Sequence, residues 1–285
     1  IVFIDINEEK AEGEAMDLSH GAAFVKPVQV RNGDYKECQD ADIIILTAGA
    51  NQKPGESRME LLKRNTEVFK KIVPQITSNT DPENNTVLLV VTNPVDILTY
   101  VTYKLSGFPE SRVIGSGTVL DTSRFKYLLS QHCNLDPRNV HAYIIGEHGD
   151  KEVAAWSLTN ISGIPFDEYC DLCENECRYN CDNAGVQKVK DEISSIDKKG
   201  ATYYAVGLAV TRIVEGIFRD ENTILTISSV LQGVYGVENI ALSLPGIVNR
   251  EGIRNILSPE ISREEKDKFN DSAISLKKAA DNLDL

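Results

Sequence analysis

The stretch TVLLVVTNP, residues 86–94, decides the fold class of this chain together with DIIILTAG, residues 42–49. Each is a short run of apolar, largely β-branched side chains that ends in polar or small residues, which is typical of a strand followed by a loop. Because the apolar residues are consecutive and do not alternate with polar ones, both faces of each strand should be buried. Such strands belong to parallel sheets covered by helices on both faces, so we expect an α/β fold.

Strands and helices alternate along the first part of the chain. Apolar runs predict further strands at IVFIDI, VQVRNG and SRVIGSG, residues 1–6, 28–33 and 111–117. Apolar residues at helical spacing predict helices over residues 8–21, 59–78 and 95–106. The alternation indicates a doubly wound parallel-sheet domain, which we assign to residues 1–116.

The pattern changes in residues 117–285, where we expect a second domain of α+β type. Strands are predicted at RNVHAYIIG and VAAWSL, residues 138–146 and 153–158, and a long helix over residues 197–219. The runs NTILTISSVLQG and ENIALSLPGIV, residues 222–233 and 238–248, are adjacent in sequence and should pair as antiparallel strands. A final helix should begin near Ser262.

Composition restricts the class of protein. The chain has 285 residues, of which 41% are hydrophobic, so it can bury a sizeable core. A net charge of -13 argues against binding to a nucleic-acid backbone. No apolar run approaches the roughly 18 residues needed to span a bilayer, and the opening IVFIDINEEK lacks the basic flank of a secretory signal. We therefore expect a globular cytoplasmic protein that binds neither nucleic acid nor membrane.

Four of the six cysteines form a cluster with the spacing C-x2-C-x3-C-x3-C, namely Cys170, Cys173, Cys177 and Cys181. At about 100° per residue these four side chains fall on one stripe of a helix, as buried core or subunit-contact residues would. No histidine stands nearby in the sequence to complete a metal site, so we expect no metal centre. A redox or metal-binding role is the alternative.

Two polar residues follow predicted strands at positions where open α/β sheets bind ligands. Asp5 ends the first strand and could accept hydrogen bonds from the ribose hydroxyls of a dinucleotide, or could simply cap the next helix. The glycine-rich turn that should precede it by about 20 residues is not in the sequence. Asn93 could orient a nicotinamide or a substrate, or could be a turn-forming residue before Pro94.

The segment GANQKPGESR, residues 49–58, has the composition of a lid over a binding site. Its Arg58 could polarise a carbonyl oxygen, and its neutral Gln52 could face the variable end of a substrate. An ordinary solvated loop is the competing interpretation.

Three further side chains could share one cavity. Asp121 and Arg124 are three residues apart and lie on the same helix face, although a surface ion pair is the simpler explanation of that spacing. Arg124 offers a planar fork that suits a substrate carboxylate. His148 lies in GEHGD, a glycine-flanked loop after an apolar strand, from which it could act as an acid/base. If Asp121 lies close, it would orient the imidazole and raise its proton affinity.

The chain resembles the lactate and malate dehydrogenase family over its whole length, because six of its segments occur in the order found in that family. The segments are DINEEKAEGEAMDL (5–18), AGANQKPGESR (48–58), VTNPVD (91–96), GSGTVLDTSRF (115–125), GEHGD (146–150) and KKGATYYAVG (198–207). The resemblance implies an NAD-dependent oxidoreductase that transfers a hydride to a 2-oxo acid. It further implies that His148 is the acid/base, Asp121 its orienting carboxylate, Arg124 the carboxylate clamp and Arg58 the residue that polarises the carbonyl, with Asn93 bound to the substrate.

The same resemblance implies a binding site for NAD in the first domain. By this analogy Asp5 binds the adenosine ribose, Gly49 lies against the cofactor phosphates, Ser116 contacts the carboxamide and Val206 backs the nicotinamide ring. Asn93 is expected to contact the cofactor as well. Thr202 would close the substrate pocket of the second domain.

Substrate choice is expected to depend on Gln52. By the resemblance, malate enzymes of the family have a similar loop but carry an arginine at this position. A neutral glutamine leaves the second carboxylate of oxaloacetate unpaired in a closed site, whereas the methyl group of pyruvate needs no partner. We therefore expect interconversion of pyruvate and L-lactate. Malate or another 2-hydroxy acid is the alternative substrate, and a noncatalytic relative of the same fold is the alternative class.

The resemblance also implies regulation and assembly. Bacterial members are often activated by fructose 1,6-bisphosphate at a subunit interface, and Lys126 and His141 occupy the two positions expected to bind it. The usual residue at the first position is arginine, so Lys126 keeps the charge but loses the planar fork. Exposed surface residues are the alternative. The family implies a homotetramer.

The family has a strand and a glycine-rich turn before the position where the present sequence begins. In the strand order 3-2-1-4-5-6 that strand is central, so we expect a gap in the sheet between the family's second and fourth strands. For the same reason we expect the 285-residue chain by itself to be unstable or inactive.

Overall fold

The computed structural model describes residues 1–50, 55–81, 83–172 and 203–283. Its helices are α1 (Glu8–His20), α2 (Arg58–Asn79), α3 (Val95–Ser106), α4 (Val119–Cys133), α5 (Phe166–Leu172), α7 (Tyr204–Phe218) and α8 (Arg263–Ala280). Its strands are β1 (Val2–Phe3), β2 (Arg31–Asn32), β3 (Ile43–Leu46), β4 (Val87–Val90), β5 (Val113–Gly115), β6 (Val140–His141), β7 (Ile144–Gly146), β8 (Glu152–Ala154), β9 (Asn160–Ile161), β10 (Ile164–Pro165), β11 (Thr223–Val234), β12 (Val237–Asn249) and β13 (Gly252–Ile256).

One large sheet connects the two halves of the chain. Its strand order is β3-β4-β5-β11-β12-β7-β8, with β13 paired to β12. The strands β3, β4 and β5 are parallel, whereas β11 and β12 form the antiparallel pair predicted from their adjacency. The two parts meet where Gly115 of β5 pairs with Ser228 of β11. The predicted fold class, a parallel-sheet domain followed by an α+β region, is confirmed.

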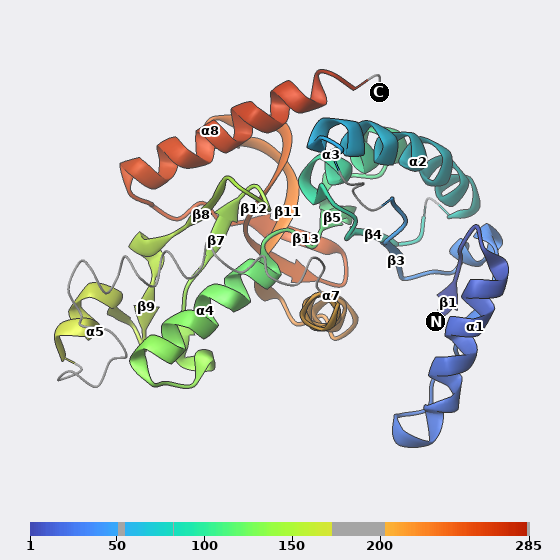
Figure 1. Cartoon of the computed structure of the whole chain (residues 1–285), viewed down its shortest axis with the longest axis horizontal. Helices are drawn as coiled ribbons and strands as arrows, with labels where there is room; N and C mark the ends of the chain where they lie inside the picture. Colours follow the sequence, from blue (N-terminus) through green and yellow to red (C-terminus); the bar gives the residue numbers. More distant parts are fainter. Residues whose placement is uncertain (51–54, 82, 173–202, 284–285) are drawn as a thin grey trace.

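Strand β4 shows why this sheet needs helices on both faces. Its four side chains, from Val87 to Val90, are all fully buried. Leu88 and Val90 belong to the core cluster that contains residues of α2 and α3, whereas Val87 and Leu89 belong to the cluster that contains residues of α7. Successive side chains of a strand point to opposite faces. Figure 1 accordingly shows α3 and α7 on opposite sides of β4 and β5.

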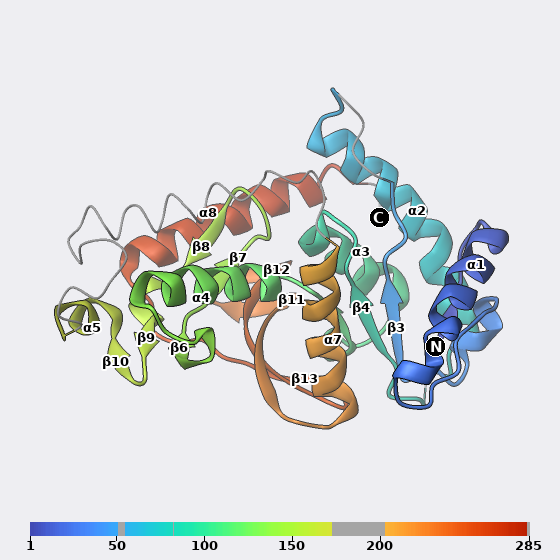
Figure 2. The same cartoon turned by 60° about the horizontal axis from the view of Figure 1, so that its bottom comes forward.

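The first two strands stand apart from the large sheet. β1 and β2 form their own parallel pair, and within the described residues no ladder joins either of them to β3. Ile45, in the middle of β3, is 42% exposed. The gap expected in the sheet is therefore present. Figure 2 shows this small unit with α1 at the end of the molecule opposite to α5.

The second half differs in detail from the sequence-based prediction. The stretch 138–146 is not one strand but two, with β6 in a three-stranded sheet with β9 and β10, and β7 in the large sheet. In the stretch 153–158 the strand β8 ends at Ala154, because residues Trp156–Leu158 form a 3-10 turn. β13 was not predicted. Of the helix expected over 197–219, the described part is α7, and residues 197–202 lie outside the described residues.

Two helices begin with reciprocal capping boxes, which fix where they start. Ser57 accepts the backbone N–H of Glu60, and the Glu60 carboxylate accepts the backbone N–H of Ser57, so α2 begins at Arg58. Ser262 and Glu265 form the same arrangement, so α8 begins next to Ser262, where the sequence predicted the start of the final helix. Among the described residues, no helix is both long and apolar enough to cross a membrane.

Candidate active site

Three predicted residues lie within three positions of the ends of the parallel strands. Gly49 comes after β3, Asn93 after β4 and Ser116 after β5. Parallel strands that are neighbours in a sheet have their carboxyl ends at the same edge, so these residues share one edge of the molecule. The backbone N–H of Ser116 donates to the carbonyl oxygen of Val90 over 2.8 Å, which ties the start of the loop after β5 to the last residue of β4.

A buried asparagine of α2 holds the loops after β3 and β4 against each other. The side chain of Asn65 accepts the backbone N–H of Ala50 at 2.8 Å and donates to the carbonyl oxygen of Asn93 at 2.9 Å. Gly49 allows this close approach, since a Cβ atom there would lie 2.4 Å from the Cγ2 atom of Thr92. Sequence analysis missed Asn65, although its position on the apolar side of an amphipathic helix was a usable signal.

The central feature of the site is a three-residue unit. Asp121, in the first turn of α4, has a side chain only 5% exposed. One of its oxygens lies 2.5 Å from Nδ1 of His148, and the other accepts a hydrogen bond from Nη1 of Arg124 at 2.9 Å. A carboxylate can only accept, so Nδ1 carries a proton and Nε2 is the ring nitrogen that can exchange a proton with a ligand. The predicted juxtaposition of these three residues is therefore present.

The electrostatics of this unit favour a protonated imidazole. Burial works against the charge, but the hydrogen bond and negative charge of Asp121, with smaller contributions from Asp96 and Glu152, raise the pKa of His148 to about 9. Burial and the charge of Asp121 raise the pKa of Glu152 to about 7. Such paired, shifted groups are the ones that acid/base chemistry uses.

Arg58 reaches the same loop from α2. Its guanidinium contacts both carboxylate oxygens of Asp150, at 2.7 and 2.8 Å. Asp150 follows His148 by two residues, so the arginine predicted to polarise a carbonyl contacts the loop that carries the predicted acid/base. Both side chains of this pair are largely exposed.

Other predicted residues are less closely associated with this unit. Asp5 is exposed after β1, where it accepts the backbone N–H of Asn7 at 2.9 Å. Val206 is half-buried in the first turn of α7. Lys126 is half-buried on α4, where burial lowers its pKa, and His141 is exposed on β6.

Several predicted residues lie outside the described residues. These are Gln52, Thr202, and three of the four clustered cysteines, Cys173, Cys177 and Cys181; of Cys170 only the backbone is described. The two cysteines whose environment is described, Cys38 and Cys133, are buried.

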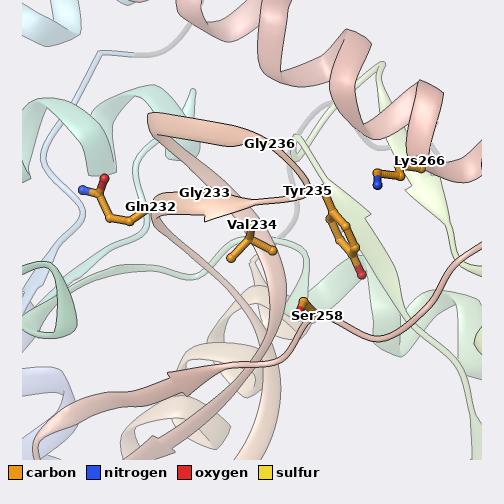
Figure 3. Close-up of a pocket in the computed structure, with 7 residues that line it drawn as sticks. All are labelled: Gln232, Gly233, Val234, Tyr235, Gly236, Ser258 and Lys266. Carbon is orange, nitrogen blue, oxygen red and sulfur yellow. The ribbon is translucent and has the colours of Figure 1, made fainter.

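A surface groove at the turn between β11 and β12 is a separate feature (Figure 3). It is lined by residues 232–236, Ser258 and Lys266, none of which is a predicted site residue. Lys266 lies 5.6 Å from the ring centroid of Tyr235, and the Tyr235 hydroxyl donates to the Pro259 carbonyl. The groove shares no residue with the unit formed by Asp121, Arg124 and His148.

Comparison with known proteins gives the family. Residues 1–115 match the lactate/malate dehydrogenase NAD binding domain, and residues 118–283 match the alpha/beta C-terminal domain of the same proteins. The chain belongs to the lactate/malate dehydrogenase family. The prediction of NAD as the cofactor is confirmed at the level of this domain.

Individual relatives have names more specific than that of the family. An L-lactate dehydrogenase of Acetivibrio thermocellus is 59% identical, with all of this chain and 89% of that protein covered. L-lactate dehydrogenase 1 of Clostridium acetobutylicum is 57% identical over 99% of this chain and 90% of that protein. The structure of a minor L-lactate dehydrogenase from Enterococcus mundtii in its ligands-bound form superposes with a TM-score of 0.91 at 44% identity, covering 100% of this chain and 90% of that one.

Proposed function

We propose that this chain catalyses the reversible reduction of pyruvate to L-lactate by NADH, as its relatives' names indicate. The observation that carries the proposal is the unit in which Asp121 contacts both His148 and Arg124. It places an acid/base next to a guanidinium that can bind a carboxylate, which is what reduction of a 2-oxo acid requires.

The residues present fit the cofactor. The loops after β3, β4 and β5 lie at one edge of the sheet, and Gly49 leaves the backbone there without a side chain. Asp5, Gly49, Asn93, Ser116 and Val206 would hold NADH in the domain formed by residues 1–116. When bound, the dihydronicotinamide supplies the hydride.

The chain's own residues would supply the rest of the chemistry. His148 would donate the proton on Nε2 to the carbonyl oxygen of pyruvate as the carbonyl carbon is reduced, and the imidazole would be left neutral. Asp121 holds the imidazole in one orientation and stabilises its charged form before the transfer. In the direction of lactate oxidation, the neutral His148 takes the hydroxyl proton back.

The two arginines would act on different parts of the substrate. Arg124 binds the carboxylate with the guanidinium nitrogens that do not contact Asp121. Arg58 turns from Asp150 toward the carbonyl oxygen and stabilises the charge that develops there. Asn93 supplies a further hydrogen bond to the substrate.

The preference for pyruvate over oxaloacetate rests on Gln52, with Thr202 closing the pocket in the domain formed by residues 117–285. A neutral amide at this position leaves the second carboxylate of oxaloacetate unpaired. Malate, or another 2-hydroxy acid, is the alternative substrate class.

Regulation and assembly complete the proposal. Lys126 and His141 would bind fructose 1,6-bisphosphate at an interface of a homotetramer in the cytoplasm. Support comes from the contact of α4 with β6, the elements that carry the two residues. A basic side chain and an imidazole suit the phosphate groups of that ligand.

The test follows NADH absorbance with the purified full-length gene product, offering pyruvate and oxaloacetate in parallel, each with and without fructose 1,6-bisphosphate. Turnover of pyruvate, reduced roughly 10³-fold by His148→Gln, is the expected result. Preference for oxaloacetate would make this a malate enzyme whose second carboxylate is bound elsewhere. Binding of NADH without turnover of either substrate would indicate a noncatalytic relative.

A further inference from the structure

A second carboxylate, Asp96 in the first turn of α3, is bound to the backbone of His148. Asp96 is 2% exposed. One of its oxygens accepts the backbone N–H of His148 at 2.7 Å, and the other accepts the hydroxyl of Ser228 at 2.6 Å. A single side chain thus joins α3, the loop after β7 and the strand β11.

Packing alone does not explain an acid at this position. Its neighbours in the first turn of α3, Val95, Ile97 and Leu98, are buried apolar residues, and burying a carboxylate among them is costly. Burial is the largest influence and raises the pKa of Asp96 above its ordinary value, although the hydrogen bonds from Ser228 and from the His148 N–H and the charge of His148 act in the opposite direction. Both partners are donors, an arrangement that suits the ionised form, and the N-terminal turn of a helix favours negative charge.

The loop has a second anchor that is neutral. The backbone N–H of Glu147 donates to the hydroxyl oxygen of Ser272, on α8, at 3.1 Å. The consecutive backbone N–H groups of Glu147 and His148 are therefore held by side chains from two different helices, α8 and α3. Asp96 is a carboxylate and Ser272 is neutral. Comparing variants of the two residues therefore separates the effect of holding the loop in place from the effect of a nearby charge.

We propose that Asp96 is a positioning residue for the acid/base step: it fixes the backbone of His148 and places a second negative charge, after that of Asp121, close to the imidazole. This inference rests on the proposed function. The charged and titratable groups around the imidazole come from several elements, and they are Asp121 and Arg124 of α4, Asp96 of α3, Glu152 of β8, Arg58 of α2, and Glu147, Asp150 and Lys151 of the loop itself.

Removing the charge of Asp96 should shift the pH dependence of the reaction in a predictable direction. Reduction of pyruvate needs the protonated imidazole, and oxidation of lactate needs the neutral one. Removing a nearby negative charge weakens proton binding by His148. In Asp96→Asn, the alkaline limit of pyruvate reduction and the acidic limit of lactate oxidation should both move to lower pH, by about one unit. The asparagine oxygen can still accept the His148 N–H.

The experiment compares the wild-type chain, Asp96→Asn and Ser272→Ala in pH profiles of both reaction directions. Ser272→Ala removes a hydrogen bond to the same loop without changing charge, so its pH limits should stay at the wild-type values whatever the change in kcat. NMR titration of the His148 ring, in histidine-labelled protein with NADH absent, should show the same shift for Asp96→Asn. Coincident titrations of wild type and Asp96→Asn, or equal shifts in both variants, would overturn the inference.

Two further outcomes are distinguishable. If the full-length wild-type protein turns over neither substrate, the proposed function fails, while the NMR titration still tests the effect of Asp96 on His148. If Asp96→Asn does not fold, hydrogen exchange of the wild-type chain tests whether the His148 amide is held in place. The His148 amide should then be protected as strongly as the buried amides of α3. Exchange as fast as that of an exposed loop would contradict the anchor.

Discussion

Arg58 and Asp150 form a two-point ion pair, 2.7 and 2.8 Å long, that joins the start of α2 to the loop carrying His148. The side chains are 61% and 75% exposed, so the pair contributes little to folding. Its significance is positional, since the capping box of Ser57 and Glu60 sets where α2 begins and hence where Arg58 stands.

Replacing Arg58 should therefore affect catalysis and leave stability nearly unchanged. Arg58→Lys keeps the charge but loses the planar fork, so kcat/KM for pyruvate should fall roughly 10²-fold. The free energy of unfolding should change by less than about 1 kcal/mol. Steady-state kinetics and urea denaturation measure the two effects. Lys70→Ala, which removes another exposed ion pair of α2, is the control and should leave the kinetics unchanged.

Removing the charge of Asp121 should separate the orientation of His148 from its presence. Asp121→Asn takes away the hydrogen bond and negative charge that raise the pKa of His148 to about 9. Pyruvate reduction should fall between about 10²-fold and 10⁴-fold, because the proton donor is lost at neutral pH and the ring can adopt the wrong tautomer. The alkaline limit of pyruvate reduction should also move to lower pH. An unchanged pH profile would show that Asp121 does not govern the imidazole.

Glu152 should make the folded chain less stable as pH rises. Burial and the charge of Asp121 raise its pKa from 4.5 to about 7, so the folded state holds a proton that the unfolded state has already released. This contribution is complete below about pH 4.5 and is lost as pH rises through 7. Glu152→Gln should flatten the corresponding part of a plot of unfolding free energy against pH. The same change at the exposed Glu238 of β12 should leave the slope as in the wild type.

Asn65 should contribute more to stability than its position in a helix suggests. Asn65→Leu has a similar shape but leaves the N–H of Ala50 and the carbonyl of Asn93 without their partner. Each such loss costs about 1–3 kcal/mol, and KM for NADH should rise because the loops after β3 and β4 separate. Chemical denaturation and kinetics with varied NADH check both effects. Gln75→Leu, on the exposed side of α2, is the control and should change neither the free energy of unfolding nor KM for NADH.

The sequence predicted those features that a periodic pattern or a local signal encodes. The consecutive apolar residues of β4 indicated burial on both faces, and Ser262 marked the start of α8. The spacing of Asp121 and Arg124 suggested a shared face, but only the fold brings His148, 27 residues from Asp121, against them.

What escaped prediction depends on contacts between distant segments. Asp96 binds a backbone N–H 52 residues away, and such a contact leaves no trace in spacing or composition. β13 was missed because its partner β12 determines its pairing. The split of residues 138–146 into β6 and β7 likewise depends on which sheet each part joins.

The pairing of Gly115 with Ser228 has a mechanical consequence. Because β5 and β11 pair at this point within one hydrogen-bonded sheet, a wide rotation of one half of the described chain against the other would break that pairing. Access of ligands must then come from movement of individual segments at the sheet's edge. In calorimetry, the large sheet and the helices packed on it should melt as one unit, with a single heat-absorption peak.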